Sequence, residues 1–380
     1  MEYECINIFS EITLPQEPAD ISESRSEELR RLDRTRNAKI DQQEEDKQGQ
    51  QGVNLLEIIN AALRPSGENF NHRFFEGGIN VILGSNDSGK TNLCRFLTGL
   101  SSTVSGKILI DGQSYSKKSK SRPVSFVVQD FVNYPLWTVE ENIHSPLRAQ
   151  GNFTKTQISA RTYELGELLG LTNYLKRHPS ELSGGQQQRV ALGRALAKNA
   201  KIMVLDEPFV NLDYKLRESL RMELKSLAAN LDTTIVYSTM DPKEAFAIAD
   251  DVLLIDDYSF IQSGSPLEVY SRPVSVLAAD LMSDPRVNVF RSKQTLIEPS
   301  QMLAVRPEHL RPAESLSKSD SLIFELRIEH LENAGSETFV QGRVDGNEWI
   351  MKTEEKITLK IGENIEVGAP KTEILKFGLQ

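Results

Sequence analysis

The sequence contains only two cysteines among its 380 residues, Cys5 and Cys94, which excludes a disulfide framework and offers no metal-binding spacing. No apolar run approaches the roughly 20 residues that span a bilayer, so any link to a membrane requires a partner. A basic excess is also missing: the formal net charge is −10, whereas a nucleic-acid binder usually presents a basic face. The N-terminus, MEYECINIFSEITLP, carries acids where a secretory signal would carry Lys or Arg. These absences predict a protein of the reducing cytosol.

Residues 20–52 have very few apolar side chains. They include SESRSEELRRLDRTRNAK and DQQEEDKQGQQG, and Leu29, Leu32 and Ile40, with Ile21 just before them, are the few large apolar side chains that interrupt the polarity. Such a stretch cannot bury enough apolar surface to offset the entropy that it loses on ordering. We therefore expect residues 1–52 to form a solvated, flexible N-terminal extension, with a docking arm for a partner as the sharper alternative.

Residues 53–284 alternate short apolar strands with helical segments. The runs INVIL, VSFVV, KIMVL and TTIVYS are bounded by turns, as is typical of strands buried on both faces of a parallel sheet. Between them lie helical patterns such as TNLCRFLTGL, in which Leu93, Phe96, Leu97 and Leu100 recur at helical spacing. This alternation predicts a layered α/β domain.

After Pro285, strand follows strand. The runs SLIFELRIEH, ETFVQGRV, EWIMK and NIEVGA are separated by Gly, Asn and Asp turns, as in VDGNEW. We therefore predict that residues 285–380 form a small all-β barrel domain.

The segment GSNDSGKT follows the strand INVIL and opens a helix, which is the context that a phosphate-binding P-loop requires. Its glycines let the backbone wrap so that N–H groups and the positive end of the helix face phosphate oxygens. In such a loop Lys90 would reach the β- and γ-phosphates of ATP, and the Thr91 hydroxyl would bind Mg²⁺. Asp87 is unusual in a loop built for anions; its carboxylate either points outward or weakens nucleotide binding. The predicted nucleotide-binding residues are Gly84, Ser85, Asn86, Asp87, Ser88, Gly89, Lys90, Thr91 and Asn92.

The run KIMVLDEP places an acidic pair at the end of a buried strand. Asp206 is positioned to hold the Mg²⁺ shell, and Glu207 to orient or deprotonate the attacking water. A structural helix cap is the alternative, because Pro208 follows, but the P-loop upstream makes it the weaker one. Gln129, at the end of VSFVVQ, is a third predicted contact to Mg²⁺ and water.

The stretch LSGGQQQRVALGRALAKNAKIMVLDEPFVNLD resembles the ATPase subunits of ABC transporters, and the resemblance covers residues 53–284 nearly continuously. LSGGQ is similar to the signature of that family, and Ser183 can cap a helix whose first N–H groups bind an anion. The resemblance implies that this anion is the γ-phosphate held by a second subunit, so that two chains enclose two nucleotides head to tail. The signature residues are Leu182, Ser183, Gly184, Gly185 and Gln186, and the loop implied to communicate across the interface is Asn211, Leu212 and Asp213.

Other segments indicate which branch of this family the sequence resembles. LAVRPEHL resembles the C-terminal, OB-like domain of maltose-type carbohydrate-importer ATPases, and FVNYPLWTVEENIHSPLRAQG with NLDYKLRESLRMELKSL is most similar to the branch that serves glycerol and related polyols. Residues 131–182 would form the helical subdomain that receives the membrane subunits, with Phe131, Tyr134 and Trp137 either at that contact or in the core. The resemblance implies a peripheral protein at the cytoplasmic face of the membrane, two permease subunits, an extracytoplasmic solute-binding protein and no nucleic acid.

Met240 stands where the family normally has a His that contacts the γ-phosphate, at the end of TTIVYS. Methionine offers no proton, no strong hydrogen bond and no charge, and none of the five histidines stands at this position. We predict a degenerate switch position, with Met240 as core filler the alternative. A second departure is the lack of an aromatic between Val53 and Asn69, where the family usually stacks the adenine; Phe70 is the nearest.

Two functions are consistent with these residues. The first is a transport ATPase paired with a more complete paralogue, in which the nucleotide on this P-loop meets Met240 and turns over slowly while the partner's nucleotide meets LSGGQ. The second is an ATP-binding regulatory subunit that signals without useful hydrolysis, although intact Glu207 and Gln129 argue against it. A soluble translation or DNA-repair ATPase is a weaker rival, because the sequence shows neither tandem cassettes nor a long coiled coil.

Overall fold

The computed structural model describes residues 55–65, 67–101, 105–115, 123–129, 132–151, 153–198, 200–209, 214–231, 233–291, 302–354 and 359–378. Three predicted features lie outside these residues: the extension of residues 1–52, Phe131, and the loop of residues 211–213. No helix in the described part of the chain is long and apolar enough to cross a membrane.

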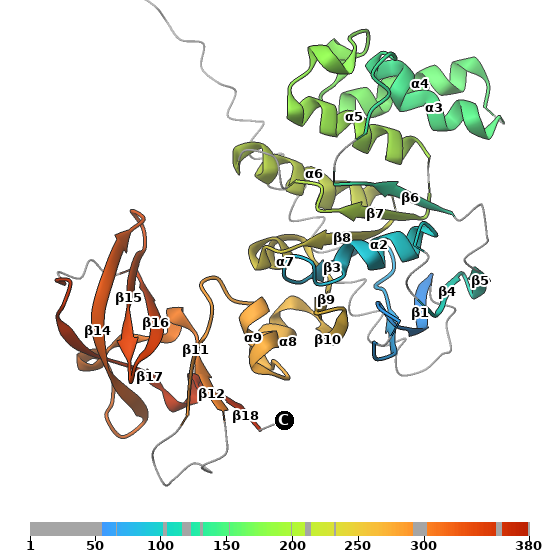
Figure 1. The fold of residues 1–380 in the computed structure, drawn as a ribbon. Helices are drawn as coiled ribbons and strands as arrows, with labels where there is room; N and C mark the ends of the chain where they lie inside the picture. Colours follow the sequence, from blue (N-terminus) through green and yellow to red (C-terminus); the bar gives the residue numbers. More distant parts are fainter. Residues whose placement is uncertain are drawn as a thin grey trace, which may run out of the picture. The chain divides into compact units, whose positions relative to one another are not determined.

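A six-stranded sheet confirms the predicted α/β fold (Figure 1). Its order is β10-β9-β3-β8-β7-β6, in which β10 is antiparallel to β9 and the other pairs are parallel. The strands are β3 (Ile79–Leu83), β6 (Val124–Val127), β7 (Ile202–Asp206), β8 (Thr234–Thr239), β9 (Asp251–Asp256) and β10 (Ser259–Gly264). Every residue of β3, β7 and β8 is buried, as expected of central parallel strands. The carboxyl ends of these three strands therefore meet at one edge of the sheet.

A second, antiparallel sheet has the order β2-β1-β4-β5. Its strands are β1 (Leu56–Ala61), β2 (Phe70–Arg73), β4 (Lys107–Ile110) and β5 (Gln113–Tyr115). One buried cluster combines Leu56 and Ile58 of β1 with Leu93 and Leu97 of helix α2 (Lys90–Thr98) and Val204 of β7. This apolar core fixes α2, the helix that follows the P-loop, against both sheets.

Three helices pack against one another: α3 (Val139–Gln150), α4 (Lys155–Leu168) and α5 (Gly184–Ala197) (Figure 1). Each begins with a capping box, in which Thr138, Thr154 or Ser183 exchanges hydrogen bonds with the residue three positions later. Helices α3 and α4 fall within the range 131–182 that the sequence predicts as helical. The remaining α-helices of the described residues are α6 (Tyr214–Leu231), α7 (Pro242–Ile248), α8 (Pro266–Ser271) and α9 (Val276–Leu281).

The C-terminal residues form two antiparallel sheets, which confirms the predicted all-β domain. Their orders are β11-β12-β18 and β13-β17-β14-β15-β16. The strands are β11 (Asn288–Arg291), β12 (Met302–Val305), β13 (Arg311–Pro312), β14 (Ser321–Asn333), β15 (Thr338–Val344), β16 (Asn347–Thr353), β17 (Asn364–Pro370) and β18 (Leu375–Phe377). The four predicted strands correspond to β14, β15, β16 and β17. The sheet β11-β12-β18 was not predicted, because its strands are only three or four residues long.

Candidate active site

The P-loop connects β3 to α2, as predicted, and two of its glycines are required by its path. A Cβ at Gly84 would lie 2.1 Å from the carbonyl oxygen of Ile255, so no larger residue fits. Gly89 has a φ of 105°, in the left-handed region that favours glycine. Gly89 is also the N-cap of α2 and makes no side-chain cap hydrogen bond. The first N–H groups of α2 are therefore available to an anion.

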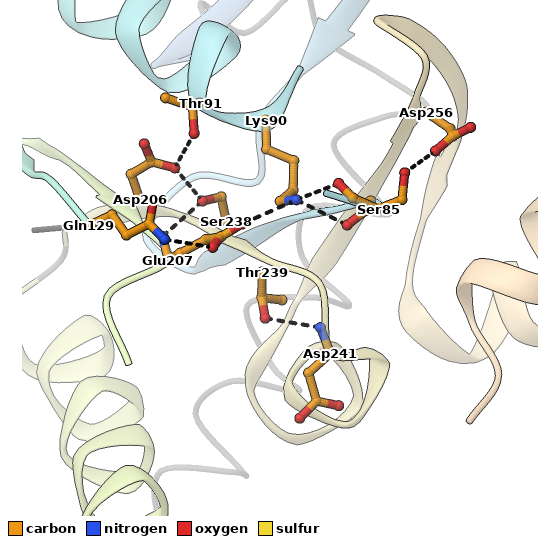
Figure 2. Close-up of polar contacts among 11 residues, drawn as sticks. Ser85, Lys90, Thr91, Gln129, Asp206, Glu207, Ser238, Thr239, Asp241 and Asp256 are labelled. Atoms are coloured by element: carbon orange, nitrogen blue, oxygen red, sulfur yellow. Dashed lines mark hydrogen bonds and ion pairs between the residues drawn. The ribbon is translucent and has the colours of Figure 1, made fainter. Parts of the chain in front are cut away.

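Lys90 is buried beside the acidic pair (Figure 2). Its Nζ donates to the carbonyl oxygens of Gly84, at 3.0 Å, and Ser85, at 2.7 Å, and lies 3.2 Å from the Glu207 carboxylate. A nucleotide phosphate would compete with Glu207 for the ammonium group, because both are anions that accept charge-assisted hydrogen bonds. We therefore expect nucleotide binding to release Glu207 from Lys90.

Asp206 ends β7 and is 3% exposed. Its Oδ1 accepts hydrogen bonds from Ser238 Oγ, at 2.8 Å, and Thr91 Oγ1, at 3.2 Å. Burial raises the pKa of the Asp206 carboxyl above its ordinary value, and the two hydroxyl donors oppose that shift. Residues 207–209 form a bend and a turn rather than a helix, which argues against the helix-cap alternative. The Thr91 hydroxyl and the Asp206 carboxylate are hard oxygen ligands of the kind that Mg²⁺ prefers, so these residues fit the predicted ion.

Glu207 has a φ of 43°, a sparsely populated conformation for a residue with a side chain. Its N–H donates to Ser238 Oγ at 3.0 Å, and its Oε2 accepts from Gln129 Nε2 at 3.3 Å (Figure 2). The structure thus brings Lys90, Asp206, Glu207 and Gln129 together, which is the set that a metal-assisted attack of water on a phosphate needs.

Met240 follows β8, and its side chain is 50% exposed, which argues against core filling. It lines a cavity of about 820 Å³ together with Gly84, Ser85 and Glu207. The neighbouring backbone is held by two hydrogen bonds, from Gly84 N to Thr239 O at 3.3 Å and from Asp241 N to Thr239 Oγ1 at 3.1 Å. Whatever side chain stands at position 240 therefore borders the space between the P-loop and Glu207.

Asp87 lies in the P-loop with a φ of 57° and an exposed side chain. Aspartate tolerates this left-handed conformation better than most residues, so it can replace a glycine here. The exposure favours the outward-pointing alternative, but the carboxylate remains a negative charge in an anion-binding loop.

Replacing Asp87 by Asn should tighten ATP binding, because it removes that charge while preserving the tolerance for a positive φ. A like charge a few ångströms away in water costs about 1 kcal/mol, or roughly a fivefold change in Kd. The measurement is equilibrium titration with ATP. Asp111→Asn is the matched control, because Asp111 has a φ of 50° in the turn between β4 and β5. Weaker ATP binding by Asp87→Asn would show that the carboxylate contributes to the site.

Sequence reasoning missed the turn between β9 and β10, which contacts the P-loop. Asp256 accepts a hydrogen bond from the Ser85 hydroxyl (Figure 2), and the Tyr258 N–H donates to the Ser88 carbonyl oxygen at 2.8 Å. Tyr258 has a φ of 60°, an outlier for a bulky side chain. Ser238 was also missed, and its only sequence signal is a hydroxyl near the end of an apolar strand. These residues hold the P-loop and the acidic pair in position.

Phe70 does not offer a stacking surface for adenine. It is 7% exposed, and its ring stacks on that of Phe260 with centroids 5.6 Å apart. Since the described residues from Leu55 to Asn69 include no aromatic, the predicted departure from the family pattern remains.

The signature residues begin α5 rather than joining the P-loop site. Ser183 is the N-cap, and its Oγ accepts from Gln186 N at 3.4 Å while Gln186 Oε1 accepts from Ser183 N at 3.0 Å. A Cβ at Gly184 would meet nothing within 4 Å among the described atoms. The Ser183 side chain therefore caps the N-terminus of α5, while Gly184 places no side chain in front of it. An anion from outside the chain could approach the first N–H groups of this helix.

An exposed apolar group lies just before α3. Val132, Tyr134, Leu136 and Trp137 are 61%, 45%, 86% and 43% exposed. The rings of Tyr134 and Trp137 are 4.5 Å apart, and the Arg194 guanidinium lies 5.0 Å from the Tyr134 ring. This exposure argues against plain core packing for both aromatics, and contiguous apolar surface of this kind often marks a contact with another protein.

Comparison with known proteins agrees with this geometry. The family model described as ABC transporter matches residues 68–210, and the TOBE domain model matches residues 303–376. The chain is 33% identical to the sn-glycerol-3-phosphate import ATP-binding protein UgpC of Brucella abortus (strain 2308), over 80% of this chain and 90% of that protein. It is 36% identical to the UgpC protein of Rhodopseudomonas palustris (strain ATCC BAA-98 / CGA009), over 72% of this chain and 77% of that protein.

A solved structure of a metal-chelate-type ABC transporter in an inward-facing conformation shares the fold. Its TM-score is 0.53 at 23% identity, and the match covers 64% of this chain and 94% of the other.

Proposed function

Because the chain belongs to the ATP-binding subunits of ABC transporters, we propose that it hydrolyses ATP to energise import of a sugar, glycerol or a related polyol, as one half of an unequal ATPase pair. One observation carries the proposal: the P-loop and Glu207 border the same cavity as position 240, which holds a methionine. The proposed class of transported solute is supported by the relatives, whose names specify sn-glycerol-3-phosphate import.

Nucleotide binding would begin at the P-loop, where the N–H groups of the loop and the Lys90 ammonium receive the phosphates. As a phosphate takes over Lys90, Glu207 loses its 3.2 Å ion pair and becomes free to accept a proton from the attacking water. Gln129, whose amide contacts Glu207 at 3.3 Å, would orient that water. Thr91, Asp206 and Gln129 would hold Mg²⁺, which when bound neutralises charge on the phosphates.

The two sites of a pair would differ in rate. The transition state on this P-loop would receive no hydrogen bond from position 240, because a thioether is not a donor. The loss of one such donor typically slows a reaction on the order of 100- to 1,000-fold. The partner's nucleotide, in contrast, would face the intact signature of this chain. A paralogue with a complete switch position would then carry most of the turnover.

The remaining partners follow from the same proposal. The complex would contain two transmembrane permease subunits, one of which would dock at the exposed group of Val132, Tyr134, Leu136 and Trp137, and a solute-binding protein would act through them. The chain would lie at the cytoplasmic face of the membrane, held there by the permeases.

The test compares ATP turnover of the purified chain, of the paralogous ATPase subunit, and of the two mixed. We expect the chain alone to stay well below the roughly 1–1,000 s⁻¹ typical of enzymes, and mixing to raise turnover above the sum of the separate rates. A full rate from the isolated chain would overturn the unequal pair.

A regulatory subunit that binds ATP without useful hydrolysis is the second candidate, favoured only by Met240. The two candidates are distinguished by measuring ATP turnover of a mixed pair whose partner has lost its own P-loop lysine, so that the measured turnover comes from this chain's site alone. The proposed ATPase loses this residual rate in Glu207→Gln, whereas a pure binder shows no change.

A further inference from the structure

A cavity of about 790 Å³ lies within the C-terminal β domain, separate from the residues of the ATPase site. Its volume is within the range of small-molecule sites in proteins. Its walls come from β11, β12, β14, β15 and β16 and from the segments beside them, so residues far apart in the sequence converge on it. None of the functions discussed above uses this cavity.

One wall of the cavity is aromatic. Phe290, Phe324 and Trp349 line it and contact one another, with ring centroids 4.9 Å apart for Phe290 and Phe324, 5.5 Å for Phe290 and Trp349, and 4.7 Å for Phe324 and Trp349. The Asn288 side chain fixes β11 to β16 through two hydrogen bonds with the Ile350 backbone, at 2.8 and 2.7 Å. The wall is therefore formed before any ligand arrives, which lowers the entropic cost of binding.

A buried donor on this wall lacks an acceptor. Trp349 is 1% exposed, and its Nε1 has no hydrogen-bond partner in the part of the chain that the structure describes. Buried indole N–H groups are normally paired, because an unpaired one costs free energy. Nε1 is itself covered by neighbouring atoms, so this donor is not one of the contacts that a ligand in the cavity would make.

The rim carries positive charge, although the whole chain is acidic. Arg291, Lys318 and Lys371 line the cavity, with Asp345 as the one acid among the lining residues that the structure describes. Lys371 donates to the Ser319 carbonyl oxygen at 2.7 Å, while the exposed Arg291 and Lys318 form no ion pair with another residue that the structure describes. Free guanidinium and ammonium groups are the usual ligands of phosphate.

From this combination we propose that the cavity is a binding site for a phosphorylated sugar or polyol. The phosphate contacts Arg291 and Lys318, and the C–H face of the ligand lies on Phe290 and Phe324. An unphosphorylated sugar lacks the group that the cations need, and inorganic phosphate lacks the body that the aromatic wall needs. The proposal does not rest on ATP hydrolysis by this chain.

The chain offers its own reporter for a test, because its two tryptophans are Trp137 and Trp349. In the full chain with Trp137→Phe, Trp349 emission is titrated with glucose 6-phosphate, glycerol 3-phosphate, inorganic phosphate and glucose. We expect a saturable change with the two phosphate esters, a Kd at least about tenfold weaker for inorganic phosphate, and no change with glucose. Calorimetry of the unaltered chain should return the same order of affinity.

Two double variants locate the site. Arg291→Ala with Lys318→Ala should weaken the phosphate esters at least about tenfold, whereas Arg311→Ala with Lys376→Ala, two exposed cations that do not line the cavity, should not. Lys90→Ala should leave the Trp349 signal unchanged, which separates this site from the P-loop. The proposal is overturned if no phosphate ester binds, if the cavity double variant binds as well as the unaltered chain, or if Lys90→Ala abolishes the signal.

Discussion

Replacing Met240 by His is expected to raise ATP turnover at this chain's P-loop on the order of 100-fold, the scale of one transition-state hydrogen-bond donor. The position is suitable, because the residue borders the cavity that also contains Gly84, Ser85 and Glu207. The backbone before it is fixed by the 3.3 Å hydrogen bond from Gly84 N to Thr239 O. The imidazole of a His at position 240 would therefore lie close to the P-loop without any rearrangement of β8.

The measurement is the residual turnover of a mixed pair whose partner has lost its P-loop lysine, so that only this chain's site contributes. Met240→Leu is the matched control, since it keeps an apolar side chain of similar volume and should leave the rate unchanged. Half of the Met240 side chain is exposed, so neither variant should unfold the chain. If Met240→Leu were as slow as expected but Met240→His were no faster, the missing donor would not be what limits the site.

The sequence could predict those parts of this site in which a residue suited to the chemistry directly follows a recognisable strand. The P-loop, Asp206 and Glu207 follow buried parallel strands, and the carboxyl ends of such strands meet at one edge. Met240 also follows a strand, but its role at the site was implied by the resemblance to the family; in the structure β8 lies between β3 and β7. Gln129 required more than periodicity, since a Gln after a strand has no meaning by itself, and the P-loop and the acidic pair elsewhere in the sequence supplied the context.

Other contacts had no sequence signal, because they join residues through tertiary packing. Ser85 and Asp256 are 171 positions apart, and nothing in a hairpin turn indicates that it will meet a P-loop. The ion pair between Lys90 and Glu207 could not be predicted either, since both residues were assigned to the nucleotide and its water rather than to each other. In the β domain, Phe290 belongs to a strand of four residues, too short for alternation to be recognised, so its cavity was not predicted.

Replacing Gly184 by Asp is expected to lower ATP turnover of the mixed pair at least about 100-fold, a larger effect on the total turnover of the pair than the loss of this chain's own Glu207. In the proposed pair, the N-terminus of α5 serves the partner's nucleotide, which is the fast one. A Cβ at Gly184 meets no atom of the described residues within 4 Å, and an acid in the first turn of a helix is favourable for the helix itself. The variant should therefore fold, while its carboxylate repels the γ-phosphate across the interface.

Gly184→Ala is the matched control, because it adds a methyl group without charge and should cost far less. The decisive comparison is with Glu207→Gln in the same mixed pair, which disables only the slow site and should lower total turnover by about 1% or less, because that site is on the order of 100- to 1,000-fold slower. An equal pair of sites would respond similarly to both variants, since each would then remove one of two equivalent reactions. Equal losses of turnover from Gly184→Asp and Glu207→Gln would therefore contradict the unequal pair. They would show that this chain's own ATP site is as active as the partner's, despite the thioether at position 240.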